Sequence, residues 1–66
     1  MNNKIRVARA EVRMTQQQLA EAVGVSRQTI NAIESGKFVP STVLALKIAR
    51  TFSKSVEDIF SLEDGD

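Results

Sequence analysis

Two short helix patterns separated by a glycine constrain the fold of this chain more than any other feature. Thr15 is followed three residues later by a glutamine, and this pair predicts a capping box at the start of a helix. Gly24 suits the left-handed backbone just beyond that helix, and Ser26 can cap a second helix that ends near Ser35. Two helices joined by a three-residue turn have the spacing of a helix-turn-helix, which the sequence therefore predicts over about residues 15–35.

Three further helices are predicted around this pair. They cover about residues 4–12, about residues 41–52 and a short segment that Ser55 caps. Apolar residues recur on one face of each, and in the first of them Val12 is expected to point inward. No long segment alternates with a period of two, so a short edge pairing within residues 60–63 is the only strand left open.

The composition limits how such a chain can be stabilised. A chain of 66 residues with no linker predicts a single all-α domain over residues 1–66, which buries only about 60% of the surface of its unfolded chain. Cysteine and histidine are absent, which excludes disulfides, thiolate metal sites and histidine-based catalysis. Tight helix packing or dimerisation must therefore stabilise the fold.

Apolar residues are dense near the C-terminal end and predict a dimer surface. Exposed apolar clusters on small domains usually mark the place where a partner binds. The alternative, that these side chains complete the core of the monomer, is equally open for two of them, Phe52 and Ile59. The predicted dimer residues are Phe52, Ile59, Phe60 and Leu62.

The outer face of the second helix carries polar side chains suited to the edges of bases. With Ile30 and Ile33 facing inward, the helical rotation turns Gln28 and Asn31 outward and leaves Arg27 on the flank. Arginine can donate to both acceptors of guanine, and glutamine or asparagine can form two hydrogen bonds with adenine. Outside a helix-turn-helix such residues would be ordinary solvated surface. Inside it, we predict that Arg27, Gln28 and Asn31 read bases in the major groove.

Phosphate contacts are expected at the ends of the two helices. Helix N-termini offer unused backbone N–H groups, and short polar side chains beside them can donate to phosphate oxygens. A lysine in the loop after the second helix adds a positive charge at the same edge. The predicted phosphate-contacting residues are Gln16, Ser26, Thr29, Ser35 and Lys37.

The net charge of +1 conceals a segregation of charge along the chain. Residues 1–54 contain all nine lysines and arginines and only three acids, whereas residues 55–66 contain five acids and no base. A basic body with an acidic end suits a module that places one face on phosphates and keeps its C-terminus away from them.

One set of residues runs in order and spacing through nearly the whole chain, from about Ile5 to Phe60. The set comprises Thr15-Gln16, Leu19-Ala20, Gly24-Val25-Ser26, Ile30, Ile33-Glu34, Gly36-Lys37, Pro40-Ser41 and Leu46-Lys47-Ile48-Ala49. It resembles the Xre/Cro family, the helix-turn-helix of phage repressors and many small prokaryotic regulators. The resemblance implies a five-helix lambda-repressor-like domain, in which helices 2 and 3 form the helix-turn-helix and operator DNA is bound by a dimer.

Three details of the resemblance concern single residues. The family often pairs an arginine of the first helix with the glutamate before the glycine, which implies a structural ion pair between Arg9 and Glu34. Its glutamine in the first turn of the second helix holds a phosphate and corresponds to Gln16. Many members end the first helix with glycine or asparagine, whereas this chain has Arg13. A residue of this kind at a positive φ is strained but tolerable, so the departure affects the expected form of the turn and not the expected fold.

These observations favour a cytoplasmic, homodimeric regulator that binds an inverted repeat in double-stranded DNA, with repression favoured over activation. An alternative is an interaction protein, such as an antitoxin or anti-repressor, in which the motif mainly binds another protein. An enzyme is poorly supported, because the chain lacks histidine, cysteine and a glycine-rich phosphate loop. We expect no cofactor, metal, small-molecule ligand or membrane partner.

Overall fold

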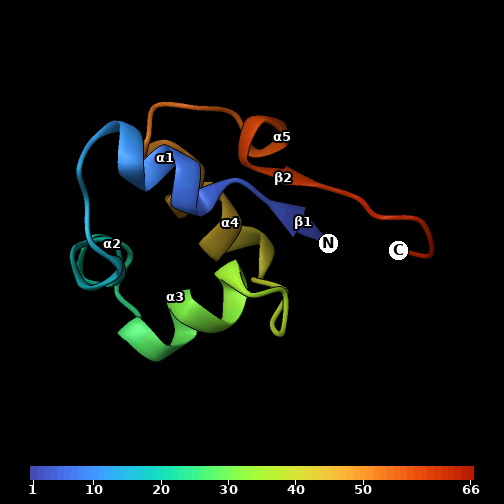
Figure 1. Ribbon diagram of the computed structural model, residues 1–66, viewed down its shortest axis with the longest axis horizontal. Helices are drawn as coiled ribbons and strands as arrows, with labels where there is room; N and C mark the ends of the chain where they lie inside the picture. Colours follow the sequence, from blue (N-terminus) through green and yellow to red (C-terminus); the bar gives the residue numbers. More distant parts are fainter.

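The computed structural model describes all 66 residues and consists of five short helices and one small sheet (Figure 1). The elements are β1 (Asn2–Asn3), α1 (Ile5–Glu11), α2 (Gln16–Val23), α3 (Arg27–Glu34), α4 (Thr42–Thr51), α5 (Val56–Ile59) and β2 (Phe60–Ser61). In Figure 1, α4 lies at the centre, with α1 and α5 above it, α2 to the left and α3 below. The five-helix fold predicted from the sequence is therefore confirmed.

Side-chain caps set the starts of four helices. In each case a hydroxyl oxygen accepts a hydrogen bond from the backbone N–H three residues further on, which satisfies a donor that the first turn leaves unpaired. At α2 the predicted capping box is complete, since the side-chain oxygen of Gln18 accepts from the backbone N–H of Thr15 at 2.8 Å. The capping residues are Thr15, Ser26, Ser41 and Ser55.

The small sheet joins the two ends of the chain. Strands β1 and β2 pair antiparallel, with Asn2 opposite Ser61 and Asn3 opposite Phe60. The side-chain amide of Asn3 also donates to the carbonyl of Ile33 at 2.8 Å, which ties the start of the chain to the end of α3. The edge pairing left open for residues 60–63 is thus present over Phe60–Ser61. The sequence did not predict the strand that pairs with it, Asn2–Asn3.

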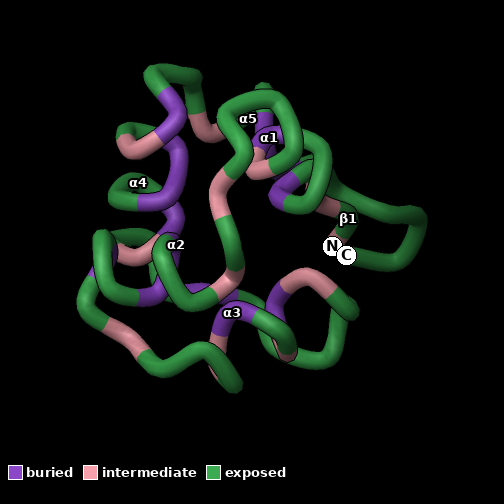
Figure 2. Tube along the Cα trace, turned by 60° about the vertical axis from the view of Figure 1, so that its left-hand side comes forward, coloured by how far each residue is buried: buried purple, intermediate pink, exposed green.

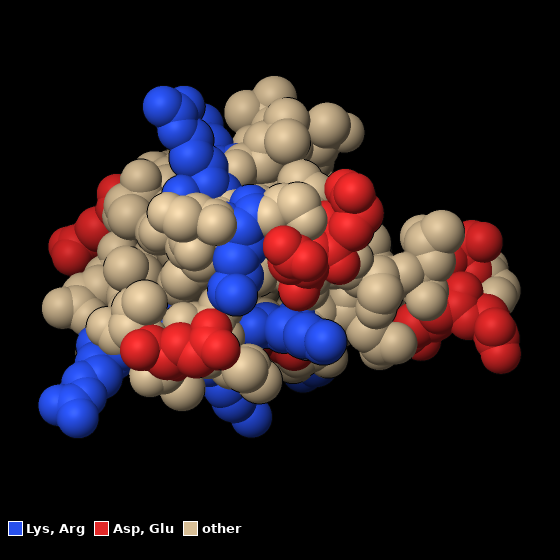
Figure 3. Space-filling model, turned by 90° about the horizontal axis from the view of Figure 1, so that it is seen from above, with Lys and Arg blue, Asp and Glu red and all other residues tan.

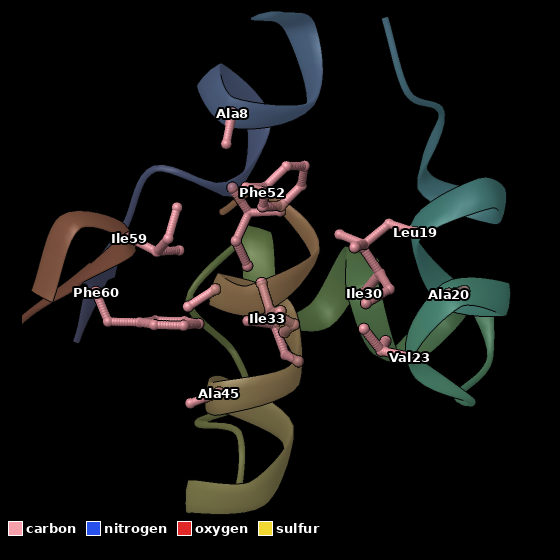
Figure 4. Packing of buried hydrophobic residues seen from close by; sticks show 13 residues of the cluster. Ala8, Leu19, Ala20, Val23, Ile30, Ile33, Ala45, Phe52, Ile59 and Phe60 are labelled. Atoms are coloured by element: carbon pink, nitrogen blue, oxygen red, sulfur yellow. The ribbon is translucent and has the colours of Figure 1, made fainter. Parts of the chain in front are cut away.

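The core is a cluster of buried apolar side chains between α4 and the other four helices (Figure 4). Figure 2 shows buried segments on the inner sides of α1, α2, α3 and α4. The largest fully buried side chains come from all five helices. They are Ile5, Leu19, Ile30, Ile33, Ile48 and Ile59.

At the end of α1, the structure differs from the expectation for Val12 and agrees with it for Arg13. Val12 is 56% exposed, so the prediction that it points inward is wrong. The helix stops at Glu11, and the turn that follows carries Val12 away from the core. Arg13 adopts a φ of 55°, the left-handed conformation expected at this turn. The fold therefore accepts a residue with a β-carbon at this turn.

Three of the four predicted dimer residues belong to the core of the monomer. Phe52, Ile59 and Phe60 are all buried within the cluster. The alternative left open for Phe52 and Ile59 is therefore the one observed, and the prediction that Phe60 forms a partner surface is wrong. The physical reason is that α5 folds back onto α4 and β2 pairs with the start of the chain, which covers them. Leu62 lies beyond β2 and is 78% exposed, so it remains available to a partner.

Candidate nucleic-acid interface

The α2–α3 pair is held at a fixed angle by a three-residue turn. Gly24 has a φ of 79°, the left-handed conformation that a β-carbon opposes. The backbone N–H groups of Gly24 and Val25 both donate to the carbonyl of Ala20, at 2.8 and 3.0 Å. Ala20 has no exposed surface, and its small side chain allows α3 to pack closely against α2.

The outer face of α3 brings together the three residues predicted to read bases. Arg27, Gln28 and Asn31 are all exposed, while Ile30 and Ile33 on the opposite side are buried in the core. Figure 1 shows α3 along the lower edge of the molecule, with no other element beneath it. The polar face is therefore free to approach a duplex, and its position is fixed by the isoleucines behind it.

The residues predicted to contact phosphates lie at both ends of α3 and at the start of α2, and some already use their side chains within the protein. The Ser26 hydroxyl accepts from the backbone N–H of Thr29 at 3.1 Å and lies 3.0 Å from the Thr29 hydroxyl. The Ser35 hydroxyl donates to the carbonyl of Ala32 at 3.2 Å. Lys37 is exposed and forms no ion pair, so its charge is available to a phosphate.

Gln16 is joined to α3 by its side chain. Its amide nitrogen lies 3.3 Å from the side-chain oxygen of Asn31 and 3.3 Å from Oε1 of Glu34. One hydrogen of this amide is therefore directed to Glu34 and the other to Asn31. The backbone N–H of Gln16 has no partner in the structure, because it lies in the first turn of α2. The sequence did not predict the contact between Gln16 and Asn31.

Arg9 of α1 and Glu34 of α3 form the ion pair that the resemblance implies. The guanidinium donates from Nε to Oε2 at 2.7 Å and from Nη2 to Oε1 at 3.1 Å, a two-point contact. The Glu34 side chain is only 1% exposed and the Arg9 side chain 15%. Nη1 of Arg9 also donates to the carbonyl of Met14 at 2.9 Å, so one guanidinium holds α1, the loop before α2 and the end of α3 together.

The carboxylate of Glu34 remains ionised in spite of its burial. Burial acts to raise the pKa of Glu34, but hydrogen bonds from Arg9 and Gln16, together with the charges of Arg9 and Arg6, hold the pKa below its ordinary value. Arg6 lies 3.6 Å from Oε1 on the solvent side and was not anticipated as a member of this group. Glu34 is thus a buried, negatively charged group directly behind the polar face of α3.

The distribution of surface charge distinguishes the two ends of the molecule. Figure 3 views the face above α1 and α5, opposite α3, where blue and red groups are interspersed, and acidic groups gather on the projecting end of the chain. That end contains Glu63, Asp64 and Asp66, beyond β2. The acidic segment therefore projects away from the α2–α3 pair, as Figure 1 also shows. No helix is long and apolar enough to cross a bilayer.

A capped helix-turn-helix that places an exposed polar face on its second helix defines a DNA-binding protein of the helix-turn-helix class. Residues 5–59 match the helix-turn-helix family. The chain belongs to the Xre/Cro-type helix-turn-helix transcriptional regulators, a family of DNA-binding proteins that are not enzymes.

Similar proteins support this membership over most of the chain. An uncharacterised helix-turn-helix transcriptional regulator of Methanocaldococcus jannaschii is 55% identical over 64 residues, which are 97% of each chain. The uncharacterised regulator YgzD of Bacillus subtilis is 52% identical over 64 residues, again 97% of each chain. The solved structure of the clp gene regulator ClgR from Corynebacterium glutamicum has a TM-score of 0.77 and 31% identity, over 82% of this chain and 57% of that one.

Proposed function

We propose that this chain is a repressor that binds an inverted-repeat operator in double-stranded DNA as a homodimer. The observation that carries the proposal is the outer face of α3. Arg27, Gln28 and Asn31 are exposed there, and the isoleucines on the opposite side of the helix are buried in the core. These are the side chains whose donor and acceptor groups match guanine and adenine in the major groove. Membership of a family of DNA-binding regulators supports the same proposal.

The dimer is proposed from the geometry of DNA reading. A single α3 of eight residues covers only a few base pairs, and two copies related by a two-fold axis would place their recognition helices about 34 Å apart on one face of the duplex. The operator would then consist of two inverted half-sites. Leu62, exposed and away from α3, is the one residue of the predicted dimer set that is free to take part.

Repression is proposed because it needs nothing beyond occupancy. A dimer bound across a promoter excludes polymerase without any further contact.

Lys37 and the backbone N–H groups at the start of α2 would supply sequence-independent contacts to phosphates. These contacts would make the affinity for DNA fall steeply as the salt concentration rises.

The proposal is tested by selecting bound duplexes from a random pool and then repeating the selection with Arg27→Ala. We expect the unaltered protein to select an inverted repeat and to protect both half-sites from cleavage. Arg27→Ala should relax the base preference at one position in each half-site by about tenfold, because one side chain that reads a base is lost.

The control in this experiment is Lys37→Ala, a phosphate contact in the proposal. It should weaken binding to all duplexes by a similar factor and leave the selected sequence unchanged. Equal binding of the unaltered protein to every duplex would contradict the operator proposal. No binding to any duplex, with retention of the fold, would favour a role in protein interaction instead.

A further inference from the structure

A chain of hydrogen bonds joins the buried carboxylate of Glu34 to Asn31 on the exposed face of α3. The Gln16 amide nitrogen is the link, since it lies 3.3 Å from Oε1 of Glu34 and 3.3 Å from Oδ1 of Asn31. Glu34 is fixed by its two-point contact with Arg9. This series of hydrogen bonds therefore begins at a rigid, buried group and ends at a side chain proposed to touch DNA.

The charge on Glu34 determines which atoms of Gln16 and Asn31 face each other in this series of hydrogen bonds. An ionised carboxylate can only accept hydrogen bonds, so the Gln16 amide must present its NH₂ group and not its oxygen. The second hydrogen of the same NH₂ group then points to Asn31, which must present its oxygen in return. The NH₂ group of Asn31 is left without a partner in the protein.

We propose that Glu34, acting through Gln16, fixes the orientation of the Asn31 amide so that Asn31 offers hydrogen-bond donors to the major groove. This inference rests on the proposed reading of bases by α3 and specifies what one of the readers recognises. Guanine presents two acceptors in the groove, N7 and O6, whereas adenine presents one acceptor and one donor. A freely rotating asparagine can satisfy adenine through two hydrogen bonds, but an Asn31 whose oxygen is held by Gln16 matches guanine.

Glu34 and Gln16 are thus positioning residues, and Asn31 is the residue that contacts the base. A purely structural role for Gln16 would alter stability or overall affinity. The proposed role also alters which base is preferred at a single position of each half-site, and this readout separates the two.

The test is a competition assay with every single-base variant of the selected half-site, performed with three variants of the full chain. Gln16→Met breaks the chain of hydrogen bonds and leaves the Arg9–Glu34 pair intact. Gln17→Met is the matched control, because Gln17 is exposed and its side chain forms no hydrogen bond. Asn31→Ala removes the reader and identifies the base position that it contacts.

We expect the unaltered protein and Gln17→Met to prefer guanine over adenine by about tenfold at the position where Asn31→Ala loses its preference. In Gln16→Met this ratio should fall by at least about fivefold toward adenine, while the preferences at other positions are retained. Circular dichroism of each variant checks that the fold is intact.

The outcomes separate the inference from the function on which it rests. If Asn31→Ala changes no base preference, Asn31 does not read a base, and the assignment of this residue fails. If Asn31→Ala loses a preference that was for adenine, or if Gln16→Met keeps the guanine preference, Asn31 remains a reader and the orienting role of Glu34 and Gln16 is overturned.

Discussion

Replacing Arg9 with methionine is expected to lower the free energy of unfolding by about 3 to 5 kcal/mol. The substitution leaves the carboxylate of Glu34 buried without its two-point partner, which costs about 3 to 5 kcal/mol. A domain of this length has a total stability of only about 3 to 10 kcal/mol, so the loss consumes much or all of it. The free energy of unfolding, measured by circular dichroism in urea, gives the result directly.

Two further variants show whether the loss comes from the unpaired charge. Arg6→Met removes the other arginine near Glu34, which is 77% exposed and 3.6 Å away, and should cost about 1 kcal/mol or less. The double variant Arg9→Met, Glu34→Leu removes both charges and should recover most of the stability that Arg9→Met loses. If Arg9→Met were no less stable than Arg6→Met, the pair would have no structural importance.

Acid should weaken the same ion pair from the side of Glu34. The pKa of Glu34 is lowered in the folded chain, so its stabilising contribution is fully present above the ordinary value of 4.5 and is lost as the pH falls through the lower folded value. Other carboxyl groups whose pKa is lowered, such as that of Asp58, contribute equally to the unaltered protein and to the double variant. The free energy of unfolding should therefore fall more steeply below pH 4.5 in the unaltered protein than in the double variant.

Replacing Phe60 with glutamate is expected to prevent folding, although the residue stands close to the exposed C-terminal end. Phe60 is 6% exposed, and its ring lies within the buried cluster (Figure 4). The loss of a large buried side chain costs about 3 to 5 kcal/mol, and an unpaired charge in its place adds to that. Circular dichroism at neutral pH should show an unfolded chain.

Leu62→Glu is the matched control, since it makes the same kind of change two residues further on at a position that is 78% exposed. Its stability should change by no more than about 0.5 kcal/mol. Sedimentation of this folded variant then tests whether Leu62 contributes to a dimer. A folded Phe60→Glu variant with weakened dimerisation would contradict the assignment of Phe60 to the core of the monomer.

The helix boundaries were predictable because they depend on local chemistry. Ser26 and Ser41 bond to the backbone three residues away, and Gly24 adopts its left-handed conformation within its own turn, so each signal is contained in a few residues. The outward face of α3 followed from the helical repeat once Ile30 was placed inward. These local rules were sufficient for the five helices and for the side chains that line the candidate interface.

The features that could not be predicted depend on contacts between distant segments. Phe60 is apolar in either role, and only the pairing of β2 with β1 decides that it is covered by the monomer. Gln16 and Asn31 are 15 residues apart, and each was assigned to DNA separately. No spacing rule indicates that their side chains meet, because the angle between α2 and α3 determines the contact.

We propose that the outer face of α3 is the surface of this protein that meets DNA. NMR spectra recorded while the selected duplex is added to the protein test this claim most directly. We expect the largest changes at the backbone and side-chain N–H signals of Arg27, Gln28 and Asn31, with smaller changes at the start of α2. Changes confined to α5 and the acidic C-terminal segment, with the α3 signals unmoved, would contradict the claim.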